Sequence, residues 1–90
     1  METDLNKILE DYEEIREISE RGICGLYNFM FTTGLVIGIT KTSYTGRYCF
    51  PSKTEAIKAI RSWDGTGDPI GDWIKYKGYP DERSNPNYGK

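Results

Sequence analysis

The apolar positions near the start of the chain repeat at the spacing of a helix. Between residues 4 and 21 they stand three and four apart, which places them on one stripe of a helical surface. Thr3 or Asp4 is a suitable N-cap and Gly22 a suitable stop. We therefore expect an acidic, amphipathic helix within residues 1–22, with its periodic part over residues 4–21. Its apolar stripe consists of Leu5, Ile8, Leu9, Tyr12, Ile15 and Ile18.

From residue 23 the period changes to two, which is typical of strands. The apolar runs GICGLYNFMF and LVIGIT are separated by Thr32-Thr33-Gly34, so we expect an antiparallel hairpin with its turn there. RYCF, residues 47–50, predicts a further strand, and residues 23–50 would then hold antiparallel strands. The first of these strands is apolar on both faces, which leaves open a cover on two sides or a homodimer interface.

The clearest local signal lies at Ser52 and Glu55, which are spaced as a capping box. The apolar residues that follow fall on one side of a helix, and Gly65 is a natural stop for it. We expect this second helix over residues 52–64. Its apolar side consists of Ala56, Ile57, Ala59, Ile60 and Trp63.

The run WDGTGDPIGDWIKYKG, residues 63–78, combines turn residues with two tryptophans. Asp68-Pro69 favours a turn, and residues 72–77 alternate as a strand whose lysines suit a sheet edge. Residues 79–90 carry two prolines and little to bury, which predicts an extended or disordered tail. The expected fold is α+β: the N-terminal helix, a three- to four-stranded antiparallel sheet with the second helix packed on it, and this tail outside a single domain of residues 1–78.

The residue inventory argues against an enzyme. The chain has no histidine, so the commonest general base, the usual triads and most zinc sites are missing. The glycines of the 65–71 turn follow a helix and lack the Lys-Ser/Thr of a phosphate loop. Asp64, Asp68 and Asp72 recur every four residues, whereas a calcium loop of the EF-hand type needs acids every two. We expect no catalytic residues, no metal and no cofactor.

Charge is distributed unevenly along the chain. Residues 1–21 hold eight acidic and three basic residues, while the chain as a whole has a net charge of −2. An acidic surface repels nucleic acid and suits a basic protein partner, so we do not expect sequence-specific DNA binding. The candidate partner-binding residues are Glu10, Asp11, Glu13, Glu14 and Glu17, together with Asp64, Asp68, Asp72 and Trp73 of the turn.

A second group of residues combines cations with aromatic rings. Arg47, Tyr48, Trp73 and Lys75 are the candidate ligand-binding set, because such side chains stack on bases and pair with phosphates. They would meet only if strand 47–50 and segment 72–77 shared a sheet face. Burial in the core is the alternative for Tyr48.

Nothing in the sequence predicts a membrane segment or an exported chain. No apolar run reaches the ~20 residues that a bilayer requires, and the N-terminus is acidic, unlike a signal peptide. We expect a cytoplasmic protein in which Cys24 and Cys49 are reduced.

Residues 47–86 resemble small uncharacterised proteins encoded by bacteriophages and prophages. The resemblance rests on the strand Arg47-Tyr48-Cys49-Phe50, the alanine-containing helix that ends in Trp-Asp-Gly, the run Gly-Asp-Pro-Ile-Gly-Asp-Trp-Ile, and the closing Asn85-Pro86. It implies a phage or mobile-element origin and a location in the cytoplasm of the host. No activity comes with it.

These observations lead to three functional hypotheses. The first is a non-enzymatic protein that binds and inhibits a bacterial defence protein or ribonucleoprotein complex, in the manner of an anti-CRISPR. The second is a small-ligand-binding protein that sequesters a nucleotide signal, with a homodimer interface as the expected location. The third is a structural or replication accessory protein of the phage that uses the 79–90 tail to dock.

Overall fold

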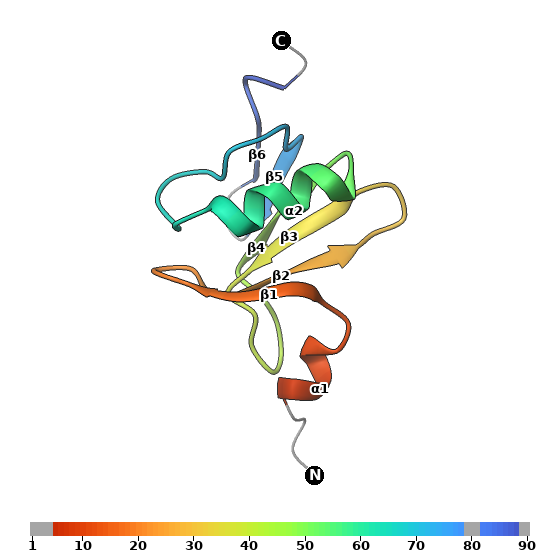
Figure 1. The fold of residues 1–90 in the computed structure, drawn as a ribbon, viewed down its shortest axis with the longest axis vertical. Helices are drawn as coiled ribbons and strands as arrows, with labels where there is room; N and C mark the ends of the chain where they lie inside the picture. Colours follow the sequence, from red (N-terminus) through yellow and green to blue (C-terminus); the bar gives the residue numbers. More distant parts are fainter. Residues whose placement is uncertain (1–4, 79–81, 89–90) are drawn as a thin grey trace.

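The computed structural model describes residues 5–78 and 82–88. One antiparallel sheet contains the described strands in sequence order, and two short helices accompany it (Figure 1). The fold is therefore mostly sheet, which corrects the expectation of three or four strands beside a long N-terminal helix. The elements are α1 (Leu5–Leu9), β1 (Glu13–Ile18), β2 (Gly22–Asn28), β3 (Thr33–Ile37), β4 (Gly46–Phe50), α2 (Lys53–Ser62), β5 (Lys75–Gly78) and β6 (Glu82–Ser84).

The predicted helix over residues 4–21 is wrong. Only α1 is helical, and β1 pairs antiparallel with β2. A spacing of three residues also suits a strand that contains a bulge, and the register does shift between Glu13 and Arg16. Glu14 has a positive φ of 53° at this bulge. Pairing with the next strand along the chain, β2, thus outweighed the local helical spacing, and Ile15 is left 43% exposed.

The hairpin of β2 and β3 turns earlier than the sequence indicated. Asn28 pairs with Thr33, and the backbone N–H of Phe29 donates to the Thr32 carbonyl over 2.9 Å. Residues 29–32 therefore form the turn, and Gly34 belongs to β3 instead. A Cβ at Gly34 would meet the Phe29 ring at 2.5 Å, so this glycine makes room for an aromatic side chain.

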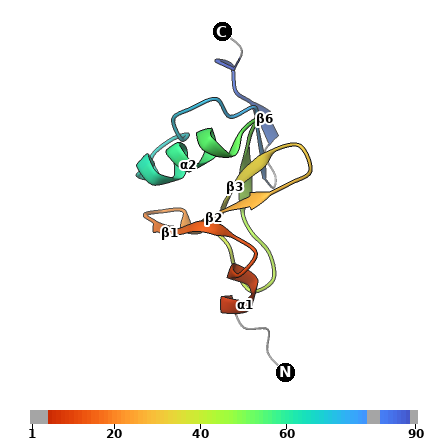
Figure 2. The ribbon, with the colours of Figure 1, turned by 45° about the vertical axis from the view of Figure 1, so that its right-hand side comes forward.

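α2 forms where the capping box predicted it. The Ser52 hydroxyl accepts a hydrogen bond from the Glu55 backbone N–H, and Trp63 is the C-cap residue. Fully buried Ala56 and Ala59 let α2 lie close to the sheet, on the face that Figure 2 shows turned away from the projecting β2–β3 hairpin. The core between helix and sheet consists of Ile18, Cys24, Leu26, Leu35, Ile37, Tyr48, Phe50, Ala56, Ala59, Ile60, Trp63 and Trp73.

The C-terminal part of the chain adds to the sheet. Segment 72–77 was expected as an edge strand, but β5 is an inner strand because β6 pairs with it. β6 also corrects the expectation of an extended or disordered tail at residues 82–84, while residues 79–81 and 89–90 of that tail lie outside the described part. Lys75 is therefore not a charged residue at a sheet edge, and its ammonium pairs with Glu82 over 2.6 Å.

The two cysteines lie on opposite faces of the sheet. Cys24 shares the α2 face with Leu26, whereas Cys49 points to the other face between Tyr48 and Phe50. Both are buried and free of a disulfide. Burial raises the pKa of the Cys24 thiol, which keeps it protonated and unreactive.

Candidate recognition surfaces

The tryptophan-rich run is a structural loop whose two ends enter the core. Trp63 and Trp73 are both buried and meet the Tyr48 ring edge-on, with centroid distances of 5.7 Å and 5.1 Å. At the exposed start of the loop, Asp64 accepts a hydrogen bond from the Thr66 N–H. Trp73 is therefore a core residue, which removes it from both the partner-binding and the ligand-binding sets.

Asp68 holds this loop to the last strand. Its carboxylate receives two hydrogen bonds from Arg83, at 2.7 Å and 2.9 Å, and one from the Tyr48 hydroxyl at 2.8 Å. The hydrogen bond to Arg83 is the main reason that the pKa of Asp68 is lowered. Arg83 also lies over the rings of Trp73 and Tyr76. The aspartate expected to meet a partner is thus occupied within the chain.

The acidic candidates do not form one surface. Glu13 pairs with Lys53 at 2.7 Å, and Glu14 pairs with Arg61 at 2.5 Å, so both hold β1 to α2. Hydrogen bonds to these cations lower the pKa of each carboxylate. Glu17 lies on the opposite face of β1, as the partner of Ile23.

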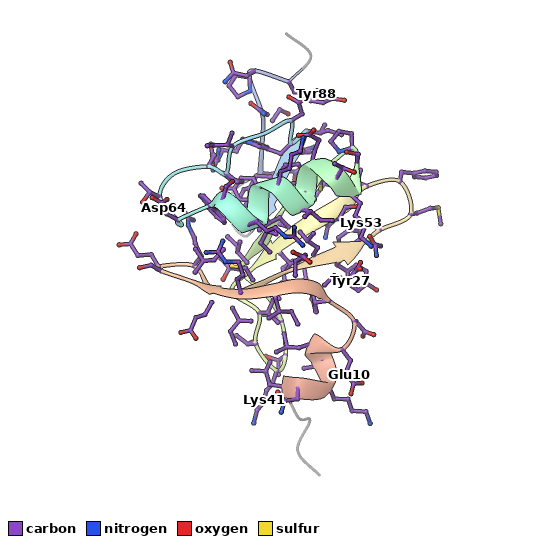
Figure 3. The ribbon with its side chains drawn as sticks, viewed as in Figure 1. Glu10, Tyr27, Lys41, Lys53, Asp64 and Tyr88 are labelled. Carbon is purple, nitrogen blue, oxygen red and sulfur yellow. The ribbon has the colours of Figure 1, made fainter. Side chains whose placement is uncertain are left out.

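Glu10 and Asp11 are exposed in the turn between α1 and β1. Figure 3 shows Glu10 and Tyr27 on the same side of the molecule, away from Asp64. The acids of the N-terminal segment and those of the 64–72 loop therefore offer separate patches. Asp72 is exposed on the loop. It takes part neither in the ion pairs of Glu13 and Glu14 with α2 nor in the ion pair of Asp68 with Arg83.

The sheet divides the candidate ligand-binding set. In the register of β4 with β5, Tyr48 lies opposite Tyr76, Arg47 opposite Lys77, and Cys49 opposite Lys75. Because successive side chains alternate between faces, Arg47 and Lys75 share the face without α2, whereas Tyr48 and Trp73 belong to the core. The four residues cannot surround one ligand.

Sequence reasoning missed the tip of the β2–β3 hairpin. Met30 is 87% exposed and Phe31 is 86% exposed, whereas Phe29 is half-buried beneath them. Phe29, Met30 and Phe31 continue the run of apolar residues of the preceding strand, so the sequence predicts that they belong to that strand. Asn28 was the unused turn signal, because the turn was expected at Thr32-Thr33-Gly34.

The face of the sheet that α2 leaves uncovered carries a row of aromatic rings. Tyr27 lies 5.6 Å from Tyr12 and 4.8 Å from Phe29 between ring centroids. The Arg47 guanidinium lies 4.4 Å from the centroid of Phe29 and donates to the Tyr44 hydroxyl at 2.7 Å. We call this surface the open face.

Two hollows accompany these features. One of about 250 Å³ lies between α1 and the β3–β4 loop, and the other of about 330 Å³ lies between loop 68–73 and residues 85–87. Within the described residues, no three cysteine, aspartate or glutamate side chains gather as metal ligands would.

Comparison with protein-family models, with curated proteins and with solved structures gave no match. Neither helix in the described part of the chain is long and apolar enough to cross a membrane.

Proposed function

We propose that this chain is a non-enzymatic phage or mobile-element protein that binds and inhibits a bacterial defence complex, in the manner of an anti-CRISPR. The observation that carries the proposal is the hairpin tip, where Met30 and Phe31 expose nearly their whole side chains. Apolar side chains of this size are normally buried, and an exposed apolar patch is typical of a protein-interaction site. The defence target is part of the proposal, because the resemblance to phage proteins implies an origin for the chain and no activity.

Packing contacts and one backbone hydrogen bond hold the base of the hairpin tip. Phe29 at its base is fixed between Gly34, Arg47 and Tyr27, and the turn is closed by the hydrogen bond from Phe29 to Thr32. A projecting element held in one conformation loses little entropy on binding. The expected partner surface is an apolar pocket that accepts the Met30 and Phe31 side chains.

The acidic residues near the tip indicate which charge the partner should carry at the rim of its pocket. The ring row links the tip to Tyr12, and Asp11 and Glu10 precede Tyr12 in the chain. A partner with positive charge beside its apolar pocket would complement both features. Reversal of Glu10 and Asp11 to lysine should then weaken binding more at low salt than at high salt.

Capture from the bacterial host tests the proposal. The double variant M30S/F31S removes the anchor, while I70S removes another apolar side chain, 79% exposed, from a different loop. We expect native mass spectrometry to find one defence complex with the wild type and with I70S, and to find it lost with M30S/F31S. Inhibition of the isolated complex must follow the same order.

Two outcomes contradict the proposal. One is a wild-type chain that leaves its host without a stoichiometric protein partner. The other is a partner retained equally by M30S/F31S, which would place the contact elsewhere.

A further inference from the structure

Over β4 to β6 the open face carries more positive charge than the fold neutralises. Across β4, β5 and β6, Arg47 lies opposite Lys77, and Lys77 lies opposite Glu82. The carboxylate of Glu82 is taken by Lys75. Over the described parts of β4, β5 and β6, Arg47, Lys75 and Lys77 therefore share this face with one carboxylate, Glu82, which pairs with Lys75 and also interacts with Lys77.

Arg47 is held as a binding group would be. Its guanidinium rests on the Phe29 ring and donates through Nη1 to the Tyr44 hydroxyl, which fixes its orientation. Its Nε is buried and forms no hydrogen bond in the described part of the molecule, while the Cys49 side chain interacts with the guanidinium. A partly desolvated cation whose donors are not all paired is stabilised by an anion at the N–H groups that remain accessible.

Aromatic rings stand beside these cations. Tyr44 is 38% exposed and Tyr27 is 37% exposed, so each presents ring surface to solvent. Tyr44 also lines the hollow of about 250 Å³ that lies between α1 and the β3–β4 loop, together with Lys41 and Ser43. A cation pair next to exposed rings on a sheet is the combination that binds phosphates and stacks bases.

We propose that the open face binds a nucleotide unit, with its phosphate between Arg47 and Lys77 and its base on the ring of Tyr44. Arginine beside a second cation suits the charge of a phosphate, and the tyrosine hydroxyl orients the guanidinium. Of the ligand-binding set that the sequence suggested, this site retains Arg47. Lys77 and Tyr44 take the places of Tyr48 and Trp73. Phe29 at the base of the hairpin tip supports Arg47, but the site uses neither Met30 nor Phe31 and does not rest on the proposed function.

The test uses the full chain at low salt and three probes: inorganic phosphate, adenosine monophosphate, and a ten-nucleotide oligothymidine. We expect amide shifts of β4 and β5 in two-dimensional NMR with both nucleotide probes. Tighter binding of the oligonucleotide assigns the site to a single strand, and equal or tighter binding of the monophosphate assigns it to a free nucleotide. Either result supports a nucleotide unit.

Matched variants locate the site. K77S removes one exposed cation from the open face, and we expect it to weaken nucleotide binding about fivefold to tenfold at low salt. K58S removes a lysine from the outer side of α2 and should leave binding unchanged. Y44A should weaken nucleotide binding about tenfold, because it removes the ring on which the base stacks.

Three outcomes overturn the proposal. They are no shift with either nucleotide at millimolar concentration, binding of phosphate as tight as that of the nucleotides, and equal weakening by K77S and K58S. Since K77S alters an exposed side chain, an unchanged melting temperature will show that its effect comes from the site and not from folding.

Discussion

At the scale of single residues, Tyr48 organises the C-terminal half of the molecule. Its buried ring meets Trp63, Trp73 and Tyr76, and its hydroxyl donates to Asp68. Burial and then the hydrogen bond to Asp68 raise the pKa of Tyr48 to about 12. Tyr48, a candidate ligand contact, is therefore a core residue. The fold keeps its phenol protonated to a higher pH than in the unfolded chain.

This protection can be measured by titration. Because the unfolded phenol has a pKa of about 10, the stability that Tyr48 contributes is complete below pH 10 and is lost as the pH rises towards about 12. NMR of ¹³C-labelled tyrosine rings should show one phenol that titrates near 12. In D68N the pKa of Tyr48 should fall but stay above 10, since burial is the larger cause. An unchanged value in D68N would contradict the role of the carboxylate.

At the scale of elements, an arginine from β1 holds the end of α2. Arg16 donates through Nη1 to the carbonyls of Ile60 and Trp63, which the last turn of the helix leaves unpaired. This contact places a positive charge at the negative end of the helix dipole. It also explains why a charged residue points towards the α2 face of the sheet.

Replacement of Arg16 separates this cap from ordinary surface pairing. R16M should lower the free energy of unfolding by about 1–3 kcal/mol, because partly buried carbonyls lose a charged donor. R61M breaks the exposed pair with Glu14 and should cost clearly less than R16M, because exposed ion pairs contribute little to stability. Urea denaturation of both variants gives the comparison. Equal losses would show that Arg16 contributes only as a surface charge.

The elements that could be predicted are those with local signals. α2 could be predicted because its signals, the capping box at Ser52 and the alanines that follow it, lie within a few residues of each other in the sequence. β1 could not be predicted, because its pairing with β2 depends on contacts that its own spacing does not encode. Arg47 and Lys75 share a face, as expected for the case in which strand 47–50 and segment 72–77 belong to one sheet. Burial in the core was an expected alternative for Tyr48, whereas no signal separated Trp73 from this face, because the register of β4 with β5 is not encoded in either segment alone.

At the scale of the whole molecule, the helix covers only part of the sheet. α2 packs on β1 to β4, while β5 and β6 continue beyond it (Figure 1). That end is held by Trp73, by the cation–ring contacts of Arg83, and by its ion pair with Asp68. Exposed ion pairs contribute little, so the two ends of the sheet should differ in local stability.

Native-state hydrogen exchange will measure this difference. We expect the amides of β3, whose residues are all buried, to exchange only through global unfolding. The amides of β5 and β6 should exchange through a local opening of lower free energy, and R83A should lower that value further without changing it in β3. Such an opening would release Lys77 from its place opposite Arg47 and couple the strand to the proposed nucleotide site. Equal protection of β3 and β5 would instead show that the sheet opens as one unit.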